Sequence, residues 1–329
     1  MQYRSLGKSG IQASAVAFGG GPIGGGPWGA VDETEAISAI HACIDDGINL
    51  FDTAPVYGVG TSEELLGKAI AGRRDKVLIA TKCGLVWHVQ KGTPFHKMFS
   101  GKIVYRYLGP ESIRYELDQS LRRLRTDYID VYQTHWQDST TPIATTMEVL
   151  VSLRQEGKIR AIGVSNCSVE QLETYETVGP IACAQEKYNM IERGIELDLV
   201  PFCLRRKIGV LAYTPLASGL LTGKVDAARS IPAGDHRHDH PFFTREAREA
   251  VQELFRKLQG VADSYKISYS QLAIAWTIAQ PGITHALVGA RNVRQGRENA
   301  AAGHVVLNEA DLRAVEEVLT KKAFAVSRS

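Results

Sequence analysis

The amino-acid sequence predicts an α/β fold in which eight parallel strands close into a (β/α)8 barrel, the TIM barrel architecture. Short runs rich in β-branched residues alternate with amphipathic helical stretches along the whole chain. Such strict alternation is typical of parallel strands that are covered by helices. The strand-like runs number eight, which suits a closed barrel, and one barrel can use all 329 residues. We therefore expect a single domain over residues 1–329.

The predicted strands are short and apolar. In chain order they are Ala15–Gly19, Asn49–Ala54, Val77–Lys82, Tyr128–His135, Ile159–Asn166, Ala182–Asn189, Ile208–Pro215 and His285–Ala290. Helical periodicity predicts helices at Glu33–Asp46, Ser62–Ala71, Pro110–Arg125, Pro142–Glu156, Ser168–Thr177, Leu197–Arg206, Arg245–Asp263 and Tyr269–Ala279. Tyr3–Gly10 is expected to form a short hairpin that plugs the barrel floor, within about residues 1–14.

The composition excludes several classes of protein. The 38 basic and 36 acidic residues leave a net charge of +2, which argues against a nucleic-acid coat or a membrane-surface protein. Met1–Gly10 has no apolar core for a secretory signal, and no run is apolar for long enough to cross a bilayer. The five cysteines lack the spacing of a metal or redox motif. We expect a cytoplasmic protein, monomeric or weakly homo-oligomeric, without membrane or nucleic-acid partners.

A glycine-rich segment near the N-terminus formally matches a dinucleotide-binding turn. Gly19–Gly24 reads Gly-Gly-Gly-Pro-Ile-Gly after a predicted strand. That motif requires a helix to open at its glycines, so that the helix N-terminus faces the pyrophosphate. Here proline and further glycines follow before any helical pattern begins, and both residues disfavour a helix. We therefore interpret the segment as a loop at the barrel mouth.

The longest segment without periodicity is Asp226–Pro241. A loop of this length in a compact domain is usually functional or mobile. Its alternating His236, His238 and His240 could indicate a metal site, but no further ligand cluster accompanies them. We favour a polar surface loop and predict no metal.

Four polar residues stand at or just after the ends of three consecutive predicted strands. Asp52 and Lys82 end their strands, Tyr57 follows Asp52 by five positions, and His135 ends the next strand. In a (β/α)8 barrel, the C-terminal ends of the strands face one mouth, where catalysis takes place. The active site is therefore predicted at this mouth.

These residue types suit the reduction of a carbonyl group. Hydride arriving at the carbonyl carbon leaves negative charge on the oxygen, which must then be protonated. Tyr57 can donate that proton if the ammonium of Lys82 stabilises its phenolate form. Asp52 would keep Lys82 charged, and His135 could hydrogen-bond the carbonyl oxygen.

The same motifs resemble the catalytic tetrad of the aldo-keto reductase family. They are Asp-Thr-Ala-x-x-Tyr-Gly around Asp52 and Tyr57, Thr-Lys at Lys82, and Gln-x-His at His135. The resemblance implies an NADPH-dependent enzyme that reversibly reduces small aldehydes or ketones to alcohols. Tyr57 would be its proton donor.

The resemblance extends to the cofactor. Ser165 and Asn166, in Gly-Val-Ser-Asn, resemble the residues that hold the nicotinamide carboxamide, and Gln185 resembles the glutamine that completes this contact. Tyr213 resembles the aromatic residue that stacks on the nicotinamide ring. The pyrophosphate would be lined by Pro215, Leu216, Ser218, Leu220 and Lys224, within a cofactor-covering loop at about residues 216–243.

A last motif resembles the family's adenosine-phosphate site. It comprises Gly289, Arg291, Gln295, Glu298 and Asn299, at the start of a helix whose N-terminus favours phosphate. Arg291 could hold the extra phosphate of NADPH through two hydrogen bonds. Arg294 and Arg297 either add positive charge there or are solvated helix residues.

Within the family, the chain resembles the bacterial branch related to potassium-channel β subunits. An alternative function is therefore a cofactor-bound, redox-sensing regulatory subunit with slow turnover. We favour the enzyme. Trp28, Trp87 and Trp136 fall in or beside the mouth loops. They indicate either a partly aromatic substrate pocket or ordinary packing.

Overall fold

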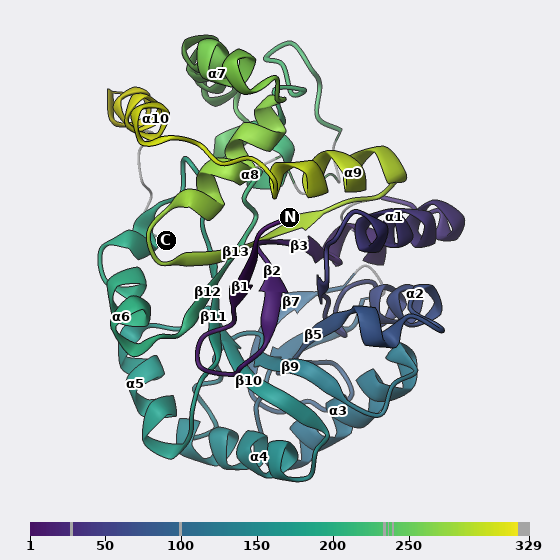
Figure 1. Ribbon diagram of the computed structural model, residues 1–329. Helices are drawn as coiled ribbons and strands as arrows, with labels where there is room; N and C mark the ends of the chain where they lie inside the picture. The colour runs from purple at the N-terminus through teal and green to yellow at the C-terminus, as the bar shows by residue number, and fades with distance from the viewer. Residues whose placement is uncertain (27–28, 99–100, 233–234, 236, 239, 322–329) are drawn as a thin grey trace.

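The structure, a computed structural model, describes residues 1–26, 29–98, 101–232, 235, 237–238 and 240–321. Eight parallel strands form a closed barrel with helices on its outside (Figure 1), which confirms the predicted fold class. Around the barrel these strands are β3 (Val16–Gly19), β4 (Leu50–Asp52), β5 (Leu78–Cys83), β9 (Ile129–Thr134), β10 (Ile159–Ser165), β11 (Cys183–Lys187), β12 (Gly209–Tyr213) and β13 (Ile283–Gly289). Each overlaps one of the predicted strands.

The barrel interior is filled by small and branched side chains that the strands alternately point inward. They form one buried cluster that contains Ala17, Leu50, Ala80, Val131, Ala161 and Leu211. Leu6 and Ile11 join this cluster from an antiparallel hairpin of β1 (Tyr3–Ser5) and β2 (Gln12–Ser14). Gly7 lies at the hairpin turn with φ +55°, where a Cβ would stand 2.2 Å from the carbonyl oxygen of Ala182. Glycine therefore allows the hairpin to pack against the start of β11.

Helices alternate with the strands. They are α1 (Glu33–Asp45), α2 (Thr61–Ala69), α3 (Pro110–Leu124), α4 (Ile143–Gln155), α5 (Val169–Val178), α6 (Leu199–Arg206), α7 (Arg245–Tyr265), α8 (Tyr269–Ala279), α9 (Val293–Ala302) and α10 (Glu309–Lys321). Serine caps fix where two of them begin, because Ser168 and Ser268 each form a capping box with the glutamine three residues later. In Figure 1, α7 and α10 lie together beyond the ring of the other helices.

A small antiparallel sheet follows β5. It consists of β6 (Leu85–Val86), β7 (Thr93–Lys97) and β8 (Ile103–Arg106), in the order β6-β8-β7. The sequence did not predict this sheet. Thr93–Lys97 is partly exposed along its whole length, and its pairing with β8 shifts register between Pro94 and His96. A half-exposed strand with a register shift lacks the alternation by which strands are recognised.

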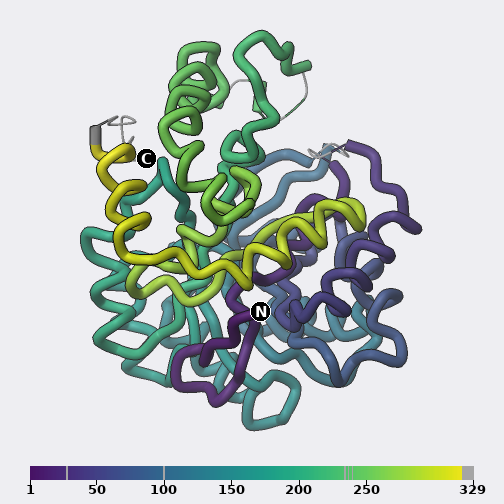
Figure 2. The backbone as a smooth tube through the Cα atoms, turned by 45° about the horizontal axis from the view of Figure 1, so that its top comes forward, coloured from purple at the N-terminus to yellow at the C-terminus, as the bar shows by residue number. Residues whose placement is uncertain are grey.

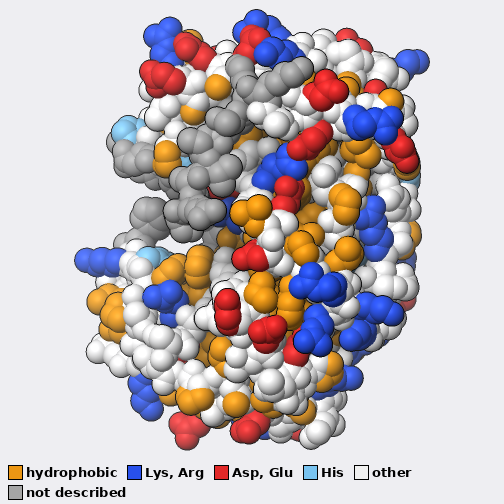
Figure 3. Space-filling view, turned by 90° about the vertical axis from the view of Figure 1, so that its left-hand side faces the viewer, with side chains coloured by type: hydrophobic (Ala, Val, Ile, Leu, Met, Phe, Trp, Pro, Cys, Tyr) orange, Lys and Arg blue, Asp and Glu red, His pale blue; other side chains and the backbone are white. Residues whose placement is uncertain are grey.

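The N-terminal segment lies beside the segment that follows α9 (Figure 2), and the amide of Gln2 donates to the carbonyl oxygen of Gly303 at 3.0 Å. Basic and acidic side chains are interspersed on the face shown in Figure 3. Among the described residues, no helix is both long and apolar enough to cross a membrane.

Candidate active site

The four predicted catalytic residues meet at the C-terminal end of the barrel. Asp52 ends β4, Lys82 is the penultimate residue of β5, and His135 follows β9 directly. Tyr57 lies in the turn that connects β4 to α2. Parallel strands in register bring these positions to the same mouth, as predicted.

Lys82 is completely buried and holds the cluster together. Its Nζ lies 2.6 Å from Asp52 Oδ2, 2.9 Å from the carbonyl oxygen of Thr53 and 3.5 Å from the Tyr57 hydroxyl. Burial on its own lowers the pKa of an ammonium group, but the Asp52 carboxylate and Tyr57 outweigh it and raise the pKa of Lys82. Lys82 therefore stays charged.

The net effect on Tyr57 differs from the expectation. Burial raises the pKa of its hydroxyl, the Lys82 ammonium lowers it, and the Asp52 carboxylate raises it again. Lys82 acts in the predicted direction, but burial outweighs it, and the pKa of Tyr57 lies above its ordinary value. Tyr57 therefore carries its proton at neutral pH, which a proton donor must do.

His135 stands beside Tyr57. Their rings are 5.8 Å apart and nearly perpendicular, at 87°. Burial holds the pKa of His135 well below its usual range, and the charges of Lys82 and His96 lower it further. The imidazole is therefore uncharged at neutral pH, and one of its ring nitrogens can donate a hydrogen bond.

The first turn of α2 supports Lys82 from two sides. Ser62 accepts a hydrogen bond from the Thr53 hydroxyl at 2.9 Å, and the Thr53 carbonyl oxygen in turn accepts from Lys82. Glu63 accepts from the Thr81 hydroxyl at 2.6 Å, directly before Lys82 in β5. Both Ser62 and Glu63 are fully buried. These contacts fix the backbone on both sides of the ammonium group.

The turn after Tyr57 is left-handed over three residues, with φ of +65° at Gly58, +56° at Val59 and +100° at Gly60. A Cβ at Gly58 would lie 1.9 Å from the carbonyl oxygen of Gly24, so the two loops touch backbone to backbone. Val59 is β-branched and lacks the conformational freedom of glycine, so its positive φ is strained. The strain is located two residues from the candidate proton donor.

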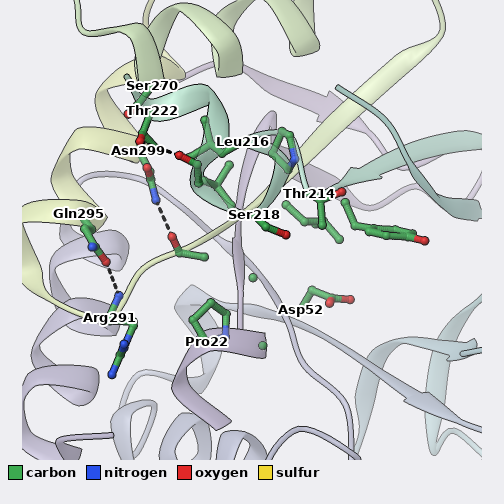
Figure 4. A pocket seen from close by; sticks show the side chains of 18 of the residues that line it. Pro22, Asp52, Thr214, Leu216, Ser218, Thr222, Ser270, Arg291, Gln295 and Asn299 are labelled. Atoms are coloured by element: carbon green, nitrogen blue, oxygen red, sulfur yellow. Dashed lines mark hydrogen bonds between the residues drawn. The ribbon is translucent and has the colours of Figure 1, made fainter. Parts of the chain in front are cut away.

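A cavity of about 760 Å³ opens above these residues. It extends from Asp52 at one end to Arg291 and Gln295 at the other (Figure 4). The predicted residues that line it are Asp52, Tyr57, His135, Trp136, Ser165, Asn166, Gln185, Tyr213, Pro215, Leu216, Ser218, Lys224, Gly289, Arg291, Gln295, Glu298 and Asn299.

Three of the predicted site residues that the structure describes do not line this cavity. Lys82 lies beneath it, in contact with Asp52 and Tyr57. The side chain of Leu220 is only 1% exposed because it packs in the hydrophobic core, so its predicted contact with the pyrophosphate is not supported. Trp87 is half-buried away from the lining. Trp28 lies outside the described residues.

Hydrogen bonds connect the side chains at the end of the cavity next to Tyr57, where the nicotinamide is predicted. Asn166 Oδ1 accepts from the Tyr213 hydroxyl at 2.8 Å, and its Nδ2 donates to the carbonyl oxygen of His135 at 2.9 Å. Ser165 donates to the carbonyl oxygen of Gln185 at 2.8 Å. Asn166 has φ +56°, a conformation that asparagine tolerates better than most residues. The edge of Tyr213 is therefore anchored to the end of β10.

At the other end, several predicted cofactor residues contact one another. Lys224 forms a 3.1 Å ion pair with Glu298, and Asn299 donates to the carbonyl oxygen of Gly289 at 3.1 Å. The backbone amide of Arg291 donates to Gln295 Oε1 at 2.9 Å. The Arg291 guanidinium also contacts the carbonyl oxygen of Ala30. Figure 4 shows Arg291, Gln295 and Asn299 together on one side of the cavity, with the Arg291–Gln295 hydrogen bond as a dashed line.

Sequence reasoning missed two cations that line the cavity, Arg229 and Arg237. Both lie in the long aperiodic segment Asp226–Pro241, directly after the residues predicted to line the pyrophosphate. Their place next to that predicted phosphate site could have indicated that they line the cavity. Arg248 of α7 is nine-tenths buried and donates to the carbonyl oxygens of Asp226, at 3.0 Å, and Arg229. Through these hydrogen bonds, Arg248 connects the start of the Asp226–Pro241 segment to α7.

Comparison with known proteins identifies the family of the chain. Residues 15–320 match the model described as "Aldo/keto reductase family". An NADH-specific methylglyoxal reductase of Escherichia coli (strain K12) is 40% identical over 327 residues, which are 97% of this chain and 98% of the relative. A probable voltage-gated potassium channel subunit beta of Arabidopsis thaliana is 33% identical over 338 residues, 98% of both chains. The second relative agrees with the predicted branch.

Solved structures of members of the same family also resemble this chain. The glycerol dehydrogenase AKR11B4 from Gluconobacter oxydans superimposes with a TM-score of 0.89 at 36% identity, over 99% of this chain and 98% of that one. An aldo/keto reductase from Klebsiella pneumoniae, in complex with NADP and acetate, gives a TM-score of 0.74 at 28% identity, over 97% and 96%. The family model spans nearly the whole chain, and relatives of 30% identity or more cover almost all of it, so the chain belongs to the aldo/keto reductase family.

Proposed function

We propose that this chain uses NADPH to reduce the carbonyl group of small aldehydes or ketones to an alcohol, reversibly, with Tyr57 as the proton donor. The observation that carries this proposal is the buried ammonium of Lys82, which lies within reach of both Asp52 and Tyr57 below a long cavity. In this proposal, residues 1–329 form one catalytic barrel domain.

Each of the four side chains has one role in the proposal. When bound, NADPH supplies a hydride to the carbonyl carbon. Tyr57 donates its hydroxyl proton to the carbonyl oxygen, and the ammonium of Lys82 stabilises the phenolate that remains. Asp52 keeps Lys82 charged and oriented. His135, which is neutral, donates a hydrogen bond to the carbonyl oxygen and aligns it with Tyr57.

The cavity fits a dinucleotide cofactor in size and chemistry. Its volume of about 760 Å³ is within the usual range for cofactor sites. Ser165, Asn166, Gln185 and Tyr213 lie at the end next to Tyr57 and would hold the nicotinamide. Pro215, Leu216, Ser218 and Lys224 would contact the pyrophosphate, and Gly289, Arg291, Gln295, Glu298 and Asn299 the adenosine phosphate. Cationic side chains therefore gather where phosphates are expected.

Tyr57→Phe tests the proposed proton donor. The substitution removes the hydroxyl and keeps the ring, so NADPH binding should persist while kcat falls about 100-fold or more. Binding is followed by quenching of tryptophan fluorescence, and turnover by NADPH consumption. A Tyr57→Phe variant with near-parental kcat would show that another group donates the proton.

The choice of NADPH over NADH is a finer proposal. The Escherichia coli relative is NADH-specific, whereas the Klebsiella pneumoniae structure holds NADP. We favour NADPH because Arg291 and Arg294 both line the cavity at its adenosine end. A guanidinium matches a phosphate better than it matches a neutral ribose hydroxyl. We therefore expect a preference of ten-fold or more, on the order of 1.4 kcal/mol.

Arg291→Ala tests this choice. The variant should lose much more affinity for NADPH than for NADH, and the difference should shrink at high salt. Arg245→Ala is the control, because Arg245 is exposed on α7 and pairs with Glu249. Equal losses for both cofactors in Arg291→Ala would mean that Arg291 does not read the phosphate.

The substrate is proposed to be small and to carry a second oxygen. Two relatives act on such compounds by name, a methylglyoxal reductase and a glycerol dehydrogenase. Trp136 lines the cavity next to His135 and packs on Phe95 of β7, with ring centroids 5.2 Å apart. We propose that Trp136 limits the size of the substrate that fits beside His135. NADPH consumption should be faster with methylglyoxal and glyceraldehyde than with benzaldehyde, and the reverse order would contradict the proposal.

A further inference from the structure

Three buried side chains form a closed ring of hydrogen bonds behind the Lys82–Asp52 pair. Gln133 Nε2 donates to Asp52 Oδ1 at 3.1 Å, and Gln185 Nε2 donates to the same oxygen at 2.8 Å. Gln185 Nε2 also donates to Gln133 Oε1 at 3.2 Å, which closes the ring. Gln133 is fully buried, and Asp52 and Gln185 are each 3% exposed. Gln133 has no role in the function proposed so far.

The charge of Asp52 dictates how both amides are oriented. A carboxylate only accepts hydrogen bonds, so each glutamine must turn its NH2 group toward Asp52. Gln185 then uses one amide hydrogen for Asp52 and the other for Gln133. The part of the Gln185 amide that can still bind a ligand is Oε1, an acceptor. Gln185 lines the cavity at its nicotinamide end.

The barrel makes room for Gln133. It lies in β9 opposite Gly163 of β10, and a Cβ at Gly163 would stand 2.7 Å from Gln133 Cγ. Cys183 of β11 packs on the other side, with its Sγ 3.9 Å from Gln133 Oε1. Strand register therefore holds Gln133 at a fixed distance from Asp52 of β4 and Gln185 of β11.

We propose that Gln133 is a positioning residue that links the Asp52–Lys82 pair to the nicotinamide end of the cavity. It shares the Asp52 Oδ1 atom with Gln185, and this leaves Oδ2 directed at Lys82. It also fixes the Gln185 amide so that Oε1 can accept a hydrogen bond from the amide N–H of a carboxamide ligand. This inference rests on the proposed function, in which that ligand is the nicotinamide.

Two substitutions at Gln133 separate positioning from packing. Gln133→Leu keeps the bulk and removes both the donor and the acceptor. Gln133→Glu keeps the shape of the side chain, and the hydrogen bonds that the new side chain can form depend on pH. The carboxyl group that it introduces can, when protonated, donate to Asp52 and accept from Gln185, as the glutamine amide does, whereas the ionised carboxylate repels Asp52. Burial next to a carboxylate makes such a group hold its proton to higher pH than in water.

The readouts are kcat between about pH 5.5 and 8.5 and the Kd of NADPH for the protein without substrate. Gln133→Leu should lower kcat about 10-fold or more at every pH, the usual effect of losing a hydrogen bond to a charged group. It should also weaken NADPH binding about five-fold, because Gln185 loses its fixed orientation. Gln133→Glu should approach the parent at the acid end and fall to the level of Gln133→Leu at the alkaline end.

Gln12→Glu is the charge control, because Gln12 is exposed in β2 at the opposite end of the barrel. It should follow the parent at all pH values. A pH-independent ratio of Gln133→Glu to parent activity would overturn the proposal, because packing alone predicts it. Unchanged NADPH affinity in Gln133→Leu would overturn the link to Gln185. If the parent shows no Tyr57-dependent reduction, the proposed function fails, whereas the NADPH titration still decides the role of Gln133.

Discussion

Replacing Lys82 by methionine removes the ammonium that pairs with Asp52 Oδ2 at 2.6 Å and keeps a side chain of similar length. Asp52 then remains as a buried carboxylate without its counter-ion. Tyr57 loses the charge that lowers the pKa of its hydroxyl, while burial and Asp52 still raise that pKa. We therefore expect both the stability and the reductase activity to fall.

The size of the stability loss follows from what Asp52 retains. Removing one partner of a buried ion pair costs about 3–5 kcal/mol. Asp52 Oδ1 keeps two amide donors, Gln133 at 3.1 Å and Gln185 at 2.8 Å. We therefore expect the lower end of the range, about 3 kcal/mol. For a chain of this length, that loss lowers Tm by about 4–5 °C.

Thermal unfolding of the protein without cofactor gives Tm, and NADPH consumption gives kcat. In Lys82→Met, kcat should fall about 100-fold or more. The double variant Asp52→Asn, Lys82→Met is the matched control, because it removes the uncompensated charge as well. It should recover most of the lost Tm and remain inactive. If Lys82→Met kept its Tm within about 1 °C and kcat within a few-fold, the ion pair would be neither structural nor catalytic.

Two further predictions concern stability. Val59→Asn should raise Tm by about 1–2 °C with kcat unchanged. Valine at a φ of +56° destabilises the folded state by about 1 kcal/mol, whereas asparagine tolerates this conformation. An equal rise in Tm from Val59→Ala would argue against relief of backbone strain. Burial raises the pKa of Glu116 to about 8 from 4.5, so between these values the folded state keeps a proton that the unfolded state has released. The free energy of unfolding should therefore fall as pH rises from 4.5 to 8, by a total on the order of 4 kcal/mol. In urea titrations at several pH values, Glu116→Gln should make the free energy of unfolding less dependent on pH. A pH dependence equal to that of the parent would contradict the raised pKa of Glu116.

The barrel and the four strand-end residues could be predicted because their signals are local. Each strand is a short buried run, and Asp52, Lys82 and His135 stand at the end of such a run or next to it. Parallel register then brings these ends to one mouth without further information. The sign of the Tyr57 pKa shift could not be obtained in this way, because it depends on how deeply the folded barrel buries the hydroxyl.

The parts that sequence reasoning missed depend on contacts between distant segments. Ser62 and Glu63 read as ordinary residues at the start of a helix, yet both are buried against the strands that carry the tetrad. Gln133 was noted only as the first residue of the Gln-x-His motif, and its role depends on β4 and β11, which place Asp52 and Gln185 beside it. A buried polar residue in a barrel strand, two positions before a candidate catalytic histidine, was the signal that could have identified it.

The two ends of the cavity are held by interactions of different strength. At the tetrad, the charged and amide groups are buried and hydrogen-bonded to one another, so their orientation does not depend on a ligand. At the other end, where the adenosine phosphate is predicted, Lys224 pairs with Glu298, but the Lys224 side chain is 50% exposed, and exposed pairs contribute little. A substitution among these outer residues should therefore change cofactor affinity or preference without disturbing the chemistry.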